Sequence, residues 1–330
     1  NILALLQYIQ PNLTKTDVRR MSRIVKVILS MTGRVTMLGI SRWAGNGGSY
    51  RTVQRFFSTV MPWPELFDRF FEQHLYNPKG EYFLVGDESI ITKSGKETHG
   101  LDYFFSGLLN KVVKSIGIFT LALVDVPERQ SYPLRVEQVV RSEAEKAAAT
   151  KGSKNRDKTQ VELTEELKRI QKMVKKLLAR LQNGIQVRHL ALDGHFGNNN
   201  ALQMVRQCDL HLISKLRCDS KLHFIYDGEQ KKKDAANGTA KESTAQYPEK
   251  YLVETRTEGD IEIRIYHTEM LHSDFAQSLN VVILTKTNTT TGVFANVNLF
   301  SSDLDLSWQK IIDWYSLRFQ IEFNFRDAKQ

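Results

Sequence analysis

The order of strand-like and helix-like segments between residues 81 and 217 constrains the fold of this chain most. Three apolar runs come first, each with the length and composition of a buried strand, and the turn-like segment VPERQ joins the second to the third. The pattern then predicts a long amphipathic helix, a strand, a helix and a last strand. These seven segments are residues 81–91, 115–125, 131–140, 159–181, 187–193, 198–207 and 211–217.

Three consecutive strands favour an antiparallel meander, and the following strand–helix–strand order gives the outline of a ribonuclease H-like α/β sheet. The very polar stretch 141–158 is predicted to be an exposed, mobile loop. Residues 218–303 hold five short β-rich runs separated by polar clusters, which predict a mostly β insertion. The lysine-rich loop 228–243 inside it is expected to be disordered.

The first 78 residues are helical in pattern. The segment MLGISRWA, the glycine break GNGGS and the segment SYRTVQRFFSTV have the outline of a helix-turn-helix. Its second helix would display Arg51 and Arg55 to DNA. A simple helical hairpin with solvated arginines is the alternative, and the sequence leaves both open.

The predicted fold class is therefore α/β: a ribonuclease H-like mixed sheet with helices, a mostly β insertion, and an all-α N-terminal DNA-binding region. The predicted parts are a helical region 1–78, the first part of a catalytic core 79–217, a β-rich insertion 218–303, and the end of the core 304–330.

The closing stretch Trp308–Gln330 has no Pro or Gly and is predicted to form one long helix. At about 100° per residue, Tyr315, Arg318, Glu322 and Lys329 share one charged stripe between two apolar flanks. Such a stripe is costly to bury unless it meets a ligand, a metal or a charged partner. Alternatively, Glu322 pairs with arginines four residues before and after it, which gives an ordinary charged helix face.

Two further acids stand on the predicted strands. Asp87 lies in the middle of the first strand, and Asp193 ends the strand after the long helix. Each alone suits a turn beside glycine, but a ribonuclease H-like sheet would place them side by side, with Glu322 packed against them. Three such carboxylates repel one another unless divalent cations bind, and oxygen ligands suit Mg²⁺ or Mn²⁺. Two ions about 4 Å apart can support in-line phosphoryl transfer.

The composition favours a polyanionic partner, because the net charge is +9 and the pI is near 9.4. No apolar run reaches the length of a membrane span, and no secretion signal opens the chain. Cys208 and Cys218 lack metal-site spacing, which favours a reducing compartment. The chain starts without Met and stops inside a helical pattern, so we expect it to continue at both ends, with an oligomerisation element after residue 330.

The closing stretch carries Tyr315, Arg318, Glu322 and Lys329, separated by two, three and six residues. This spacing resembles the Y-R-E-K signature of DDE-type insertion-sequence transposases. The strings GDESIITKSGKETHGLDYFF and LALDGHFGNN resemble the first two acid blocks of that family, and the similarity spans roughly residues 80 to 330. The resemblance implies that Asp87, Asp193 and Glu322 are the catalytic, metal-binding triad. It also implies that Tyr315, Arg318 and Lys329 contact DNA phosphates.

Members of this family cut double-stranded DNA at transposon ends, often through a DNA hairpin, and join the 3′-OH to target DNA. The resemblance implies two Mg²⁺ or Mn²⁺ ions, a homodimer or larger assembly on DNA, and a bacterial cytoplasmic, nucleoid-associated location. Such enzymes often flip a base onto an aromatic residue, and Phe294 and Trp308 are equal candidates. The alternatives are a ribonuclease H-like nuclease or resolvase without strand transfer, and a non-catalytic DNA-binding protein derived from a transposase.

Histidines and lysines near these blocks have weaker claims. His189 and His195 flank Asp193, but local hydrogen bonding is favoured over metal ligation because hard cations prefer oxygen. Lys93, Lys96 and Lys111 are candidates to line a DNA path, although most lysines are simply solvated.

Overall fold

The computed structural model describes residues 2–6, 8, 13–45, 48–148, 157–181, 184–225 and 248–329. The chain divides into two compact units, and each is described by itself. The first comprises residues 1–80 together with 323–330, and the second comprises residues 81–322.

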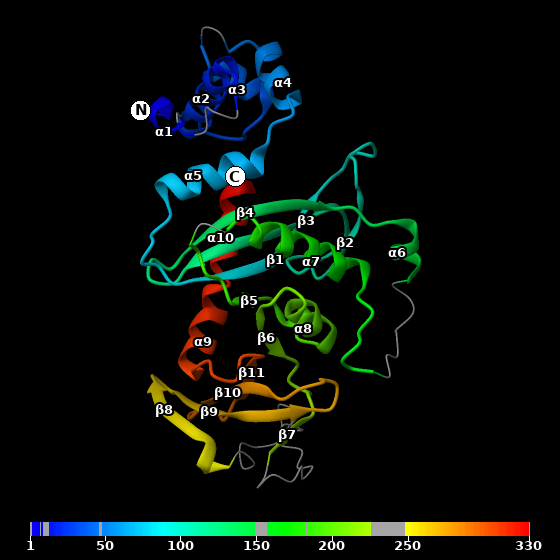
Figure 1. The fold of residues 1–330 in the computed structure, drawn as a ribbon, viewed down its shortest axis with the longest axis vertical. Helices are drawn as coiled ribbons and strands as arrows, with labels where there is room; N and C mark the ends of the chain where they lie inside the picture. The colour runs from blue at the N-terminus through cyan, green and yellow to red at the C-terminus, as the bar shows by residue number, and fades with distance from the viewer. Residues whose placement is uncertain are drawn as a thin grey trace. The chain divides into compact units, whose positions relative to one another are not determined.

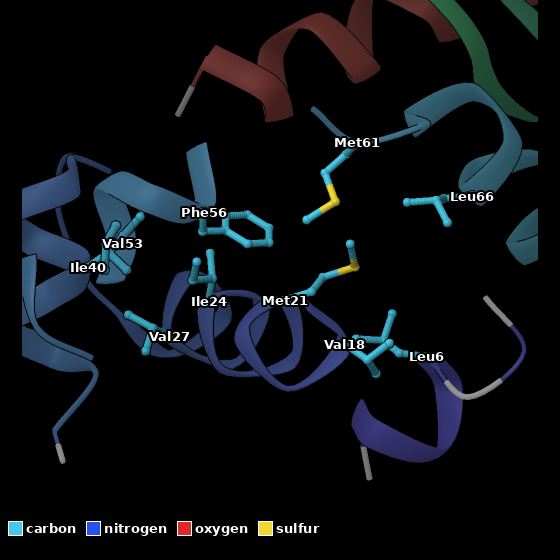
Figure 2. Packing of buried hydrophobic residues seen from close by; sticks show 10 residues of the cluster. All are labelled: Leu6, Val18, Met21, Ile24, Val27, Ile40, Val53, Phe56, Met61 and Leu66. Carbon is cyan, nitrogen blue, oxygen red and sulfur yellow. The ribbon is translucent and has the colours of Figure 1, made fainter. Parts of the chain in front are cut away.

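The elements of the first unit before residue 80 are helices packed on a common apolar core (Figure 2). They are α1 (Ile2–Leu6), α2 (Lys15–Ser30), α3 (Met37–Trp43), α4 (Tyr50–Ser58) and α5 (Trp63–His74). Local sequence explains where three of them begin. Thr14, Thr36 and Ser49 precede α2, α3 and α4, and each side-chain oxygen accepts a backbone N–H of the first turn.

Helices α3 and α4 are consecutive, with the glycine break predicted from the sequence between them; Asn46 and Gly47 lie outside the described residues. Val53 and Phe56 of α4 are buried in the core shown in Figure 2. Arg51 and Arg55 lie on the same helix and are exposed. The residues predicted to read DNA therefore face solvent.

The second unit is built on one mixed sheet, which forms eleven strands among the described residues. Its first part contains β1 (Tyr82–Thr92), β3 (Lys111–Asp125) and β4 (Gln130–Val139) as an antiparallel meander. Strand β5 (His189–Ala191) runs parallel to β1, and β6 (His211–Leu216) runs parallel to β5. The arrangement is compatible with the ribonuclease H-like fold expected from the sequence.

The β-rich runs after residue 218 extend the same sheet (Figure 1). Strand β11 (Phe294–Ser301) pairs antiparallel with β6, and β10 (Leu279–Asn288) and β9 (Ile261–His272) follow it. Strands β7 (Leu222–Phe224) and β8 (Leu252–Glu258) both pair with β9. The lysine-rich loop predicted at 228–243 lies outside the described residues.

One strand was missed by the sequence analysis. Strand β2 (Asp102–Ser106) pairs antiparallel with the start of β3 and makes a hairpin with it. It is short, and three aromatic or apolar side chains in a row hide its alternation. The predicted polar loop at 141–158 is also wrong in part, because α6 (Glu143–Ala148) is helical; residues 149–156 lie outside the described residues.

The two faces of β1 meet different helices. Side chains at odd positions, including Phe83 and Asp87, point to the face on which α9 (Trp308–Leu317) packs, since Phe83 stacks on Trp314. Glu88 points to the other face, where it feels the charges of α7 (Glu165–Leu178). We call these the Asp87 face and the Glu88 face. Helix α8 (Asn199–Arg206) connects β5 and β6 after the short η2 (Gly194–Phe196).

The single helix predicted over 308–330 is wrong. The structure has α9 and α10 (Gln320–Lys329), separated by a turn at Arg318 and Phe319. Across this turn, backbone N–H groups bond three residues back, from Phe319 to Ser316 and from Glu322 to Phe319. This is the tighter spacing of a 3₁₀ turn, which propensity alone does not reveal. Among the residues described, no helix is long and apolar enough to cross a membrane.

Candidate active site

The sheet register brings Asp87 and Asp193 together. Strand β1 pairs with β5 at Leu84 with Leu190 and at Val85 with Ala191. Asp87 lies two residues further along β1, and Asp193 lies two residues beyond Ala191, just after the end of β5, so the two residues continue this register. Neighbouring strands are about 4.8 Å apart, and the charge of Asp193 acts on Asp87. The charge of Asp193 also acts on Tyr315, so the two carboxylates belong to one site.

Backbone contacts fix the segment that carries Asp193. Its carboxylate caps η2 by accepting the His195 N–H at 3.1 Å, and its carbonyl accepts the Ser214 hydroxyl at 2.7 Å. A Cβ on Gly197 would lie 2.0 Å from the Lys215 carbonyl oxygen, so only glycine fits this close approach to β6. The glycine after Asp193 suggested a tight turn, and in the structure this turn packs on β6.

Arg318 provides the positive charge of the site. Its Nη1 lies 3.1 Å from Asp87 Oδ2, and the residue is only 5 % exposed. The guanidinium also stacks near the Tyr315 and Phe319 rings, at 5.5 Å and 4.6 Å from their centroids. Its Nε finds no hydrogen-bond partner among the described residues. A buried guanidinium with an unused N–H donor can bind a further anionic group.

Helix α9 is anchored firmly, which fixes the position of Arg318. The Trp314 ring stacks on Phe83 of β1 at 4.8 Å and meets His189 edge-on at 5.0 Å. His189 Nε2 lies 2.8 Å from Asp303 Oδ2, just before the helix begins. The prediction that His189 bonds locally is therefore wrong. The residue is buried, and it contacts Asp303, which is distant in the sequence.

Electrostatics set Asp87 apart from an ordinary carboxyl. Its pKa is raised to about 6, chiefly because burial disfavours the charged form. The charge of Arg318 opposes this shift, whereas the negative charges of Asp193 and Glu322 add to it. Burial also raises the pKa of the Tyr315 hydroxyl, and Asp193 and Asp87 contribute. The three acids therefore act on one another, and a bound cation would relieve their repulsion.

Glu322 is the one acid of the three that is exposed to solvent. It lies at the start of α10, directly after the turn. The alternative pairing of Glu322 with Arg318 and Arg326 is absent in the described part of the chain: Arg318 pairs with Asp87, and Arg326 pairs with Asp327. Nor do three acidic, histidine or cysteine side chains among the described residues converge closely enough to hold a metal ion.

The residues nevertheless suit a hard cation in part. Asp87 and Asp193 offer oxygen ligands from adjacent strands, and the Arg318 guanidinium already stands where a positive charge is needed beside Asp87. Glu322, the third acid expected from the sequence, follows a 3₁₀-type turn and is exposed.

The other predicted residues do not join this group. Trp308 begins α9, about 15 Å along the helix axis from Arg318. Phe294 begins β11 and pairs with Thr287 in the distal part of the sheet. His195 is exposed and lies 3.6 Å from Glu166. The Lys329 side chain lies outside the described residues.

Comparison with known protein families places the chain in a family. The family model described as DDE superfamily endonuclease matches residues 9–258, more than half of the chain. The chain belongs to the DDE superfamily endonucleases. The matched region contains Asp87 and Asp193 and ends before α9 and α10. No match to a curated protein was found. Membership implies a nuclease that acts on DNA, and endonucleases of this superfamily generally use divalent metals.

Asp87→Asn tests the electrostatic cost of the site in the absence of metal. Because the folded-state pKa of Asp87 is raised to about 6, ionisation destabilises the wild type as pH rises from about 4 to 6. The variant cannot ionise there. Its free energy of unfolding should match the wild type near pH 4 and exceed it by up to about 3 kcal/mol at pH 7. Urea titrations in EDTA measure the difference.

The matched control is Asp305→Asn, which removes an exposed carboxylate. We expect its stability relative to the wild type to change little over the same pH range. An Asp87→Asn difference that stays constant with pH would contradict the raised pKa.

Arg318→Ala tests the counter-ion. Without the guanidinium, the partly buried Asp87 carboxylate is left beside two other acids, and breaking a buried pair typically costs about 3–5 kcal/mol. The urea midpoint should fall accordingly in EDTA, and part of the loss should return with millimolar Mg²⁺. Arg129→Ala, which breaks the exposed pair with Asp313, should cost about 1 kcal/mol or less. Equal losses in the two variants would contradict a special role for Arg318.

Proposed function

We propose that the protein is a DNA transposase that cuts at transposon ends and joins the freed 3′-OH to target DNA. The observation that carries this proposal is the register of Asp87 beside Asp193, with Arg318 bound to Asp87. The Y-R-E-K spacing of Tyr315, Arg318, Glu322 and Lys329 supports the insertion-sequence type, because in such enzymes it would add a third acid and phosphate-binding groups to the Asp87–Asp193 site.

Each residue has a definite task in this proposal. Asp87, Asp193 and Glu322 would hold two Mg²⁺ or Mn²⁺ ions through carboxylate oxygens. When bound, these ions supply Lewis-acid activation of the attacking and leaving oxygens in phosphoryl transfer. Arg318 would turn from Asp87 to a DNA phosphate, which a planar guanidinium binds well through two N–H groups. Tyr315 stacks near Arg318 and would guide it.

DNA recognition is assigned to the helical region of residues 1–78. Exposed Arg51 and Arg55 on α4 would contact the transposon end, in the manner of the second helix of a helix-turn-helix. Residues 79–217 and 304–330 would form the catalytic core, with 218–303 as its β-rich insertion. Cutting and joining both ends of one element requires at least two active sites, so we propose a homodimer or a larger assembly on DNA, in the bacterial cytoplasm with the nucleoid.

A nuclease or resolvase of the same fold is the second candidate, because the Asp87–Asp193 pair would serve hydrolysis equally well. The two are separated by the fate of the 3′-OH. A transposase joins a pre-cleaved transposon end to a circular plasmid in Mg²⁺, whereas a nuclease only shortens it. Hydrolysis with no joined product would favour the nuclease.

Asp193→Ala and Glu322→Gln test the catalytic assignment. Each removes a proposed metal ligand, so cleavage and joining should fall by at least about a thousandfold, measured on end-labelled DNA. Binding to the same DNA should change less than about threefold, because the phosphate-binding groups remain. Asp305→Asn serves as the control and should retain activity. Wild-type levels of processing in Asp193→Ala would overturn the assignment and would favour a different site.

Arg51→Gln combined with Arg55→Gln tests the role of α4. If these side chains contact DNA, the double variant should bind transposon-end DNA about tenfold or more weakly, with hydrolysis of short nonspecific duplexes largely retained. Lys15→Gln combined with Arg19→Gln on α2, which also removes two exposed charges of the same unit, is the matched control. Anisotropy titrations measure both. Equal weakening in the two variants would show that only net charge matters.

A further inference from the structure

The Asp87 face of the sheet continues beyond the active site to the β2–β3 hairpin. Asp87 pairs with Thr120, and the same face then carries Ile118 and Ile116 on β3. Further along, Lys93 donates its N–H to the Lys114 carbonyl at 3.1 Å. Lys114 in turn pairs with Tyr103 on β2, and Val112 pairs with Phe105. Residues paired across strands project to the same side, so one face connects Asp87 with the hairpin.

We call this distal region the arm face. It consists of the side chains that follow Ile116 along this face and those at the hairpin turn: Lys93, Tyr103, Phe105, Leu108, Leu109, Val112 and Lys114.

Two lysines occupy neighbouring positions on the arm face. Lys93, directly after the end of β1, stands opposite Lys114 of β3, where like charges destabilise a sheet. No acidic side chain offsets them on this face of β1, β2 and β3 between Asp87 and the hairpin turn, all of which lies within the described chain. Asp102 belongs to the opposite face and pairs with Arg141 at 3.1 Å. The arrangement needs an anionic partner to relieve the repulsion.

Large apolar side chains surround the two lysines and are open to solvent. Tyr103 is 63 % exposed, Phe105 60 %, Val112 58 % and Leu108 95 %. The hairpin projects beyond the end of β1, as Figure 1 shows, so it is a two-stranded arm at this point. Two-stranded arms with an exposed apolar face are marginally stable in water, and contact with a ligand would protect this one.

We propose that the arm face binds the DNA duplex next to the cleavage site, with Lys93 and Lys114 on phosphates and Tyr103, Phe105 and Leu108 against the sugar–base edge. This inference rests on the proposed function, since it takes DNA as the substrate of the Asp87 site. It adds a second DNA contact, in the catalytic unit itself and separate from α4.

The geometry gives the position of the contact along the DNA. Lys93 comes six residues after Asp87, directly beyond the end of β1, which is about 20 Å at about 3.4 Å per residue. Base pairs of B-DNA rise by about the same amount, so a duplex that runs along β1 would meet the lysines about six base pairs from the scissile phosphate. The hairpin turn would lie a few base pairs further.

DNA fits this surface better than a second copy of the chain does. The chain is itself basic, with a net charge of +9, and a second copy would meet two unpaired lysines with a like-charged surface. A phosphate backbone supplies the missing anions, and apolar side chains beside lysines are a known way to hold the minor groove.

Lys93→Gln combined with Lys114→Gln tests the proposal. The probe is a fluorescein-labelled 30-base-pair duplex of mixed sequence, titrated with full-length protein at several salt concentrations. We expect the double variant to bind about tenfold more weakly at 150 mM salt, and its slope of log affinity against log salt to fall by about two, one for each phosphate contact.

The matched control is Lys172→Gln combined with Lys175→Gln, which removes two exposed lysines of α7 on the Glu88 face. This pair should leave the slope unchanged. If the arm variant retains the wild-type slope, or if it alters the oligomeric state in sedimentation and not DNA binding, the proposal is wrong and the second-copy reading replaces it. If the wild type binds no duplex even at low salt, the proposed function fails as well.

A tethered cleavage reagent tests the location independently. Leu108→Cys in a Cys218→Ser background allows iron–EDTA attachment at the hairpin turn, because Cys208 is buried and Cys218 is the exposed cysteine. On a pre-cleaved transposon end, we expect strand breaks centred roughly six to nine base pairs from the end. The same reagent at Lys172→Cys should cut at background level. Background cutting from Leu108→Cys would overturn the proposal.

Discussion

The ion pair between Arg318 and Asp87 joins the centre of the sheet to the end of α9. Both side chains are largely removed from water, so each charge needs the other. The pair depends on a rigid base: Trp314 stacks on Phe83 of β1, and His189 holds Asp303 just before α9 begins. The acids are thus held on a stable scaffold while their repulsion remains only partly neutralised.

The incomplete neutralisation of the three acids explains why this site suits a bound cation. A core optimised for stability would not place Asp87, Asp193 and Glu322 within electrostatic reach of one another. Burial is the main cause of the raised pKa of Asp87, and the charges of Asp193 and Glu322 add to it. Arg318 offsets one charge of three. The site therefore has room for further positive charge, which is the property that a family of DNA endonucleases needs and that a purely structural ion pair lacks.

The strands of the sheet could be predicted from the sequence because their apolar runs and turn residues are local signals. The juxtaposition of Asp87 and Asp193 followed from strand order, since parallel neighbours bring equivalent positions together. The 3₁₀ turn at Phe319 could not be predicted, because its residues favour a continuous helix and a tertiary ion pair lies beside it. Strand β2 was not predicted because its pairing with β3, and not its own residue pattern, defines it. Lys114 and Tyr103 were therefore overlooked.

The most direct test is anomalous scattering from Mn²⁺ in crystals of the protein with cleaved transposon-end DNA. The account predicts Mn²⁺ between the Asp87 and Asp193 carboxylates, Glu322 turned inward to join them, and Arg318 moved from Asp87 to a phosphate. Mn²⁺ bound elsewhere, or an Arg318–Asp87 pair that persists beside correctly seated DNA, would contradict it.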